Sequence, residues 1–189
     1  MIKAIILDCF GVLYVPIGED FYSAHVPDYP KHRDELRQLG RQADTGTISQ
    51  DELVAKVVEL MRLPADEVRA KLVSGLARNK ALLEFSQSVR PKYKVGLLSN
   101  ISSGTINHFF TKEEQKQYFD TVVISSDVGL AKPDPAIFTL TAERLGCLPK
   151  ECIMVDDSPM HCSGALKAGM QAVIYESTHK AIQDIQKVL

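Results

Sequence analysis

The chain has 189 residues, 45% of them hydrophobic and 24% charged, which is typical of a globular core with an elaboration. The net charge of -2 and the lack of a long basic run argue against nucleic acid or an anionic membrane surface as a partner. No stretch approaches the roughly 20 apolar residues of a membrane span, and residues 4–7 form too short a run for a signal peptide. The four cysteines show no metal-ligand spacing, and reduced thiols suit a cytoplasmic protein. We expect a monomer or weak dimer.

Short apolar runs that recur along the chain predict buried strands. These runs are residues 3–8, 94–99, 121–125, 152–156 and 171–175. Helical stretches separate them, and two have clear limits: residues 133–145 run from Pro133 to a stop at Gly146, and residues 159–168 run from Pro159 to Gly169. This alternation predicts an α/β protein with a doubly wound parallel sheet.

Residues 16–82 interrupt the alternation and are predicted to be helical throughout. Ser49 and Glu52 form a capping box at the start of one helix, and Pro64 can open another. The apolar stripes of these two helices are Leu53, Val57 and Leu60 in the first and Val68, Leu72 and Leu76 in the second. We interpret both stripes as helix–helix core. The expected organisation is an α/β core of residues 1–15 and 83–189, with residues 16–82 as a helical insert.

Four polar segments follow the predicted strands. They are Asp8 in IILDCFGVL, Ser99 and Asn100 in VGLLSN, Lys132 in GLAKPDPAIF, and Asp156 and Asp157 in IMVDDSP. Three of them end an apolar run directly, and Lys132 follows such a run after a short loop. Because a parallel sheet binds its ligand at the carboxyl ends of its strands, we expect the four segments to converge on one crevice.

Each segment has a chemical and a structural interpretation. The Asp8 carboxylate can attack phosphorus and hold Mg²⁺ with its other oxygen, or it can simply cap the turn at Gly11. Ser99 and Asn100 can bind phosphate oxygens, or nearby serines can cap a helix over SSGTINHFF. Lys132 can neutralise a phosphate and the nucleophile, although most lysines are merely exposed.

The adjacent Asp156 and Asp157 repel each other unless a cation or a hydrogen-bond donor lies between them. Magnesium fits such a pair, and the structural alternative is an aspartate that caps the following helix. His161 lies just after this pair and is assigned no role, because a lone histidine at a helix start is more often solvated or packed than catalytic.

Taken together, the strings DCFGVL, KPDPAIF and VDDSP resemble the haloacid dehalogenase (HAD) superfamily over nearly the whole chain. The resemblance implies a sheet order 5-4-1-2-3, a helical cap formed by the insert, and magnesium-dependent hydrolysis of a small phosphorylated substrate. It implies Asp8 and Lys132 as catalytic residues and Ser99, Asn100 and Lys132 as phosphate-binding residues. The implied Mg²⁺ ligands are Asp8, the carbonyl of Phe10, Asp156 and Asp157, with Asp157 the more direct ligand of the pair.

Phe10 departs from the superfamily pattern, in which phosphatases carry a second Asp that serves as general acid and base. Three alternatives follow. The first is a phosphatase that obtains this help elsewhere or acts on good leaving groups, with a sugar phosphate as substrate by analogy. The second is a 2-haloacid dehalogenase, which the Asp156–Asp157 pair and the lack of an arginine in residues 12–20 disfavour. The third is a catalytically weak relative that acts as a binding protein. We favour the phosphatase.

Overall fold

The computed structural model describes residues 1–16, 22–23, 25–44, 47–68, 76–101 and 103–189. The chain forms two compact units: a core unit, Met1–Tyr14 with Arg78–Leu189, and an insert unit, Val15–Ala77. Among the described residues, no helix combines the length and the apolar composition needed to cross a membrane.

Five strands of the core unit form one parallel sheet in the order β5-β4-β1-β6-β7. Their bounds are Ala4–Leu7 for β1, Lys94–Ser99 for β4, Thr121–Ile124 for β5, Cys152–Asp156 for β6 and Gln171–Ile174 for β7. β1 is central, and its Leu7 aligns with Leu97 of β4 and Val155 of β6. A central parallel strand is covered on both faces, so its apolar run is continuous. When the five strands are counted in chain order, this arrangement is 3-2-1-4-5, which is 5-4-1-2-3 when read from the other edge. The predicted α/β fold and the strand order implied by the resemblance are therefore confirmed.

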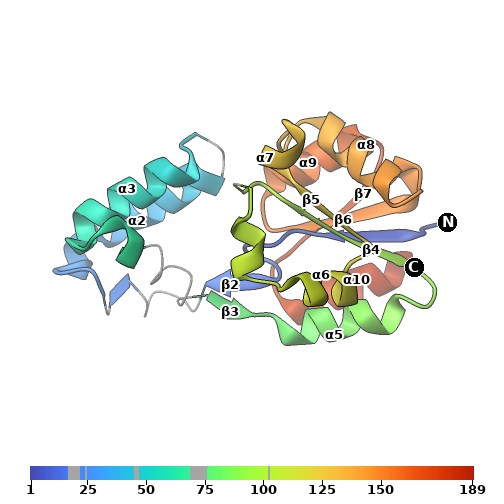
Figure 1. The fold of residues 1–189 in the computed structure, drawn as a ribbon, viewed down its shortest axis with the longest axis horizontal. Helices are drawn as coiled ribbons and strands as arrows, with labels where there is room; N and C mark the ends of the chain where they lie inside the picture. Colours follow the sequence, from blue (N-terminus) through green and yellow to red (C-terminus); the bar gives the residue numbers. More distant parts are fainter. Residues whose placement is uncertain (17–21, 24, 45–46, 69–75, 102) are drawn as a thin grey trace. The chain divides into compact units, whose positions relative to one another are not determined.

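Helices cover both faces of this sheet (Figure 1). One face carries α7 (Ser125–Val128), α8 (Pro135–Arg144) and α9 (Pro159–Lys167), and the other carries α5 (Lys80–Val89), α6 (Lys112–Tyr118) and α10 (Thr178–Val188). Two 3₁₀ turns, η1 (Thr105–His108) and η2 (Pro149–Glu151), complete the unit. Buried side chains such as Ile6, Leu98, Phe138 and Met154 form a core between the sheet and the α8 layer.

The helix starts differ in detail from the predictions. α8 begins at Pro135 and not at Pro133, because the side chain of Asp134 caps it by accepting a hydrogen bond from the Ala136 N–H at 2.9 Å. α9 begins at Pro159 as predicted, with Ser158 as its N-cap. The helix expected over SSGTINHFF is reduced to the 3₁₀ turn Thr105–His108, and a capping box at Thr111 starts α6 instead.

A close contact joins α9 to the segment that leads into α8. A Cβ atom added at Gly164 of α9 would lie 2.3 Å from the carbonyl oxygen of Pro133 and 2.9 Å from Cε2 of Phe138. Only a glycine permits this approach without moving the backbone, so Gly164 sets the spacing between α9 and the residues around Lys132.

The insert unit contains two long helices, α2 (Tyr29–Asp44) and α3 (Gln50–Met61). The predicted capping box of Ser49 and Glu52 is present at the start of α3. Val57 is fully buried, and Leu53 and Leu60 pack against the same core, which confirms the first stripe. Val68 of the second stripe belongs to this core as well, and Leu72 lies outside the described residues.

The prediction of a wholly helical insert is wrong at both of its ends. Tyr14–Pro16 (β2) and Leu76–Arg78 (β3) form a two-stranded sheet, so Leu76 lies on a strand and not on a helical stripe. The chain passes between the two units inside these strands, at Tyr14–Val15 and at Ala77–Arg78.

Candidate active site

Asp8 follows β1 directly and is 6% exposed. Its backbone N–H continues the sheet by donating to the Val155 carbonyl at 3.0 Å, and its Oδ1 accepts a hydrogen bond from the Cys9 N–H at 2.7 Å. The chain then turns sharply, with the N–H groups of Leu13 and Tyr14 both donating to the Cys9 carbonyl. The carboxylate is therefore held in a tight loop at the end of the central strand.

The side chain of Lys132 lies between two carboxylates. Its Nζ is 2.8 Å from Oδ1 of Asp8 and 2.6 Å from Oδ2 of Asp156, and the Lys132 side chain is 1% exposed. We call Lys132, Asp8, Asp156 and His161 the Lys132 cluster. Two of the predicted catalytic and metal-binding segments thus meet the predicted lysine directly.

The Asn100 side chain holds the backbone of Lys132 with two hydrogen bonds. Its Oδ1 accepts from the Lys132 N–H at 2.9 Å, and its Nδ2 donates to the Lys132 carbonyl at 2.8 Å. Ser99, the last residue of β4, is 1% exposed. The structure therefore places Asn100 beside Lys132 as a backbone clamp, a contact that the sequence did not predict.

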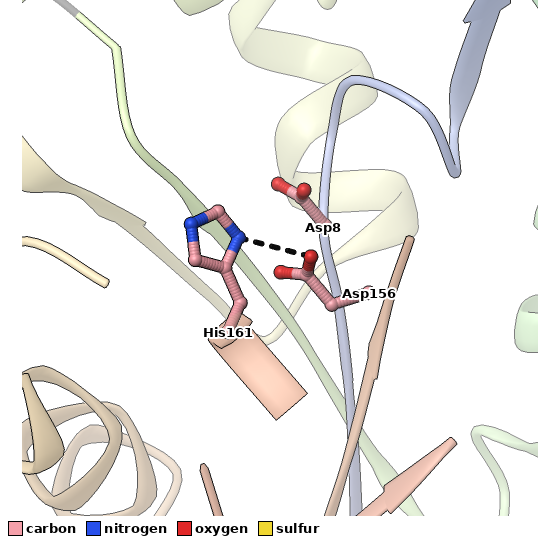
Figure 2. A group of neighbouring side chains, drawn as sticks. All are labelled: Asp8, Asp156 and His161. Carbon is pink, nitrogen blue, oxygen red and sulfur yellow. Dashed lines mark hydrogen bonds and ion pairs between the residues drawn. The ribbon is translucent and has the colours of Figure 1, made fainter. Parts of the chain in front are cut away.

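Asp156 is fully buried at the end of β6, and three polar groups contact its carboxylate. Oδ2 accepts from Lys132, while Oδ1 accepts from the Ser158 N–H at 2.9 Å and lies 3.0 Å from Nδ1 of His161. Figure 2 shows His161 turned toward Asp156, with Asp8 on the neighbouring strand end. One potential ligand atom from each of Asp8, Asp156 and His161 can be chosen so that the three atoms lie within 4.8 Å of one another.

Asp157 is exposed, in contrast to its neighbour, and it lies against the loop that carries Asp8. Gly11 has a φ of +84°, and a Cβ atom added there would lie 2.2 Å from Oδ2 of Asp157. This position therefore requires glycine both for its backbone conformation and for the space that the carboxylate occupies.

Burial and charge divide the roles of the two buried carboxylates. Burial raises the pKa of Asp8 to about 8, although the Lys132 charge opposes the rise. Burial also acts against the charged form of Asp156, but Lys132 and His161 outweigh it and hold the pKa of Asp156 below its ordinary value. Burial acts against the charged form of Lys132, yet the two carboxylates raise its pKa. Asp156 is thus the permanent counter-ion of Lys132, and a further cation would favour ionised Asp8.

Phe10 points its ring at Phe109, with the ring centroids 4.7 Å apart and the planes at 82°. An edge-to-face pair of this kind is a favourable aromatic arrangement. The Phe10 side chain is therefore engaged in packing within the core unit.

A second polar group lies where the chain passes between the units. Arg78 donates to both oxygens of Glu114, at 2.6 and 3.1 Å, to the Tyr14 hydroxyl at 2.7 Å and to the Phe109 carbonyl at 2.6 Å. Its guanidinium also stacks 4.8 Å from the Phe110 ring centroid. We call Arg78, Tyr14 and Glu114 the Arg78 cluster. Nothing in the sequence singled out Arg78, because a lone arginine before a helix carries no pattern.

Parts of the chain are similar to curated proteins of different activities. Fructose-1-phosphate phosphatase YqaB of Escherichia coli (strain K12) is 40% identical over 58 residues, which are 31% of this chain and 31% of that protein. Bifunctional epoxide hydrolase 2 of Sus scrofa is 33% identical over 75 residues, which are 40% of this chain. The match spans 14% of that hydrolase, so the resemblance covers a small part of this curated relative.

Solved structures match over almost the full length. A HAD family enzyme of Bacteroides thetaiotaomicron, solved with magnesium and inorganic phosphate, is 26% identical with a TM-score of 0.64 and coverage of 93% of this chain and 95% of that one. A dehalogenase has a TM-score of 0.75 at 18% identity, covering 100% of this chain and 97% of that one, which shows a shared fold. A family model described as haloacid dehalogenase-like hydrolase matches residues 2–169, and with the parallel sheet and its strand-end carboxylates this shows that the chain belongs to that hydrolase family.

Proposed function

We propose that the protein is a Mg²⁺-dependent phosphatase of small phosphate monoesters that works through a phosphorylated Asp8. The observation that carries this proposal is the buried Lys132 amine, 2.8 Å from Asp8 and 2.6 Å from Asp156. A cation fixed beside a carboxylate nucleophile can bring a dianionic phosphate and that carboxylate together, which like charges would otherwise oppose.

The donor set fits a hard divalent cation. Asp157 is exposed and lies against the Asp8–Gly11 loop, so the Asp8 carboxylate, the Phe10 carbonyl and the Asp157 carboxylate are the oxygens that would hold Mg²⁺. Asp156 already accepts from three protein donors, so in this proposal it orients Lys132 and leaves Asp157 as the more direct ligand. Bound Mg²⁺ would supply charge neutralisation of the phosphate oxygens.

The reaction has two displacements. An Asp8 oxygen attacks phosphorus, the bond from phosphorus to the ester oxygen breaks, and the alcohol leaves with a proton from solvent or a side chain. Water then attacks phosphorus, the Asp8–phosphorus bond breaks, and inorganic phosphate leaves with Asp8 restored. Lys132 stays charged throughout and contacts Asp8, while the Ser99 hydroxyl and the backbone at Asn100 would bind phosphate oxygens.

Phe10 decides which half of the reaction is slow. A general acid and base is worth about 10²–10⁴-fold in rate, and a phenyl ring supplies neither function. An aryloxide leaves an aryl phosphate without much help from an acid, but the water that attacks phospho-Asp8 still needs a base. We therefore expect phospho-Asp8 to accumulate during turnover. A sugar phosphate is the natural substrate class that we infer, because YqaB, a relative over 58 residues, is a fructose-1-phosphate phosphatase.

The test uses p-nitrophenyl phosphate with and without Mg²⁺, followed by acid quench and mass spectrometry of the intact chain. We expect Mg²⁺-dependent phosphate release and an 80-dalton adduct on Asp8, roughly the mass of one phosphoryl group. Asp8→Asn should abolish both, whereas Asp134→Asn, in an exposed helix cap, should keep both. If Asp8→Asn turned over at the wild-type rate, Asp8 would not be the nucleophile.

The same protein also tests the two alternatives. Halide release from 2-chloropropionate without Mg²⁺ would identify a dehalogenase. Mg²⁺-dependent binding of inorganic phosphate without turnover of any phosphate ester would identify a binding protein. A panel of sugar phosphates then defines the substrate, with the insert unit as the proposed cap that selects it.

A further inference from the structure

Asp156 has its two oxygens committed to different partners. Oδ2 accepts from Lys132 at 2.6 Å, and Oδ1 accepts from the Ser158 N–H at 2.9 Å while lying 3.0 Å from His161 Nδ1. The Ser158 donor belongs to the backbone and is present with any side chain. Among the described residues, His161 is therefore the side chain, besides Lys132, whose contact with the Asp156 carboxylate can restrict its rotation about the Cβ–Cγ bond.

The contact also fixes the proton on His161. An ionised carboxylate only accepts hydrogen bonds, so Nδ1 must carry the hydrogen. Figure 2 shows the other ring nitrogen directed away from Asp156. The backbone of His161 is set independently, because its N–H lies 3.4 Å from the hydroxyl of Ser158, the N-cap of α9. The start of α9 thus delivers two donors to one carboxylate.

We infer that His161 is a positioning residue that acts through Asp156 to hold the Lys132 amine on Asp8. Lys132 Nζ touches both carboxylates at 2.8 and 2.6 Å, so a rotation of Asp156 would move or release the amine. The His161 side chain is 13% exposed, and Asp156 is fully buried, so water has little room to replace the lost donor. The inference rests on the proposed function for its kinetic consequences, but its structural content stands separately.

Substitution of His161 by asparagine or by glutamine tests which of its two ring nitrogens is needed. The Asn Nδ2 is as many bonds from Cα as the His Nδ1, whereas the Gln Nε2 matches the His Nε2. We expect His161→Leu to lower kcat for p-nitrophenyl phosphate by roughly 10- to 100-fold with little change in KM, the loss common when a supporting hydrogen bond is removed from an active site. His161→Asn should restore most of kcat, and His161→Gln should not.

His179→Leu, an exposed histidine of α10, is the matched control and should behave as wild type. An unchanged kcat in His161→Leu, rescue by glutamine, or rescue by neither amide would each overturn the inference.

A second measurement does not depend on turnover. Acetic anhydride labelling followed by mass spectrometry reports how accessible Lys132 is, and the buried amine should react more slowly than exposed Lys150. His161→Leu should speed the labelling of Lys132 several-fold, and His161→Asn should not. If wild type hydrolyses no phosphate ester, the proposed function fails, yet this labelling pattern still supports the inference. Equal labelling of Lys132 in the wild type and the Leu variant overturns it.

If His161→Leu does not fold, ¹⁵N spectra of the wild-type imidazole decide the matter. A proton on Nδ1 of His161 supports the inference. A neutral ring with its proton on Nε2 alone overturns it.

Discussion

The Lys132 cluster and the Arg78 cluster each place one cation against a carboxylate, but in different surroundings. The side chains of Lys132 and Asp156 are 1% and 0% exposed, whereas those of Arg78 and Glu114 are 24% and 29% exposed. The Lys132 amine is a single point charge shared by two carboxylates. Arg78 instead donates to both oxygens of one carboxylate and also to the Tyr14 hydroxyl and the Phe109 carbonyl. The buried Lys132 cluster depends on charge balance, and the half-buried Arg78 cluster depends on hydrogen-bond geometry. We therefore expect the first to be destabilised most by loss of its charge and the second by a change of side-chain shape that keeps the charge.

The largest effect should come from removing the shared charge. Lys132→Met leaves Asp8 and Asp156 close together without their cation, and breaking a buried ion pair typically costs about 3–5 kcal/mol. We expect a loss of this size in the free energy of unfolding in urea, together with loss of measurable phosphatase activity. Lys150→Met, in the exposed turn η2, is the control. A Lys132→Met protein as stable as wild type would show that the cluster is not held by charge.

Magnesium should change the pH dependence of the Lys132 cluster. The folded-state pKa of Asp8, about 8, lies above its ordinary value of 3.8, so the folded protein binds the Asp8 proton more tightly than the unfolded chain does. The stability that this proton provides is fully present below about pH 4 and is lost as the pH rises toward 8. A cation that binds the carboxylate displaces that proton. The increase in Tm caused by Mg²⁺ should therefore be larger at pH 8 than at pH 6.

Two variants define this measurement. Asp8→Asn should remove the difference between the two pH values, and Asp157→Asn should reduce the Mg²⁺ effect at both. Equal stabilisation of the wild type at pH 6 and pH 8 would contradict the assignment of Asp8 as a metal ligand.

A substitution at Phe10 should have a smaller effect on stability than the loss of Lys132. Phe10→Asp removes the ring from its contact with Phe109, and we expect a loss of about 2 kcal/mol from apolar burial and the aromatic pair. The new carboxylate should also speed the decay of phospho-Asp8 by acting as a base. Phe10→Leu, which loses the aromatic pair without adding a base, should decay at the wild-type rate. If phospho-Asp8 decayed at the same rate in both variants, a carboxylate at position 10 would not act as the base.

The smallest effect should follow from changing geometry without charge. Arg78→Lys keeps the cation but loses the fork on Glu114 and the bonds to Tyr14 and Phe109, so we expect a loss of about 1 kcal/mol. Arg144→Lys, at the exposed end of α8, should leave the urea midpoint unchanged. A double-mutant cycle with Glu114→Gln should show coupling, and additive effects would mean that the fork contributes nothing measurable.

The sheet could be predicted because a central parallel strand needs a continuous apolar run, and Ile5–Leu7 has one. The convergence of Asp8 with Asp156 followed from a second rule, that the carboxyl ends of parallel strands meet at one edge of the sheet, and β1 and β6 lie side by side. By contrast, β2 and β3 have three residues each, too few to show an alternating pattern. Leu76 was therefore placed on a helical stripe by its spacing alone.

The contact of His161 could not be identified from composition, because its partner is a residue five positions earlier. One local clue existed. His161 is the third residue of a helix capped by Ser158, and side chains at that position often reach back toward the helix start. Asn100 illustrates the opposite case: its place beside the site was expected, but its clamp on the Lys132 backbone appears only in three dimensions.

The contact at Gly164 means that the segment carrying Lys132 can be displaced sterically from α9. The nearest backbone atom there is the Pro133 carbonyl oxygen, one residue after Lys132, and it leaves no room for a methyl group. A single added carbon at position 164 would push on this segment while leaving every charged and polar side chain of the site unaltered. Gly164 is thus a steric adjustment point, at which natural variation or protein engineering could tune the position of Lys132 without altering the chemistry of the site.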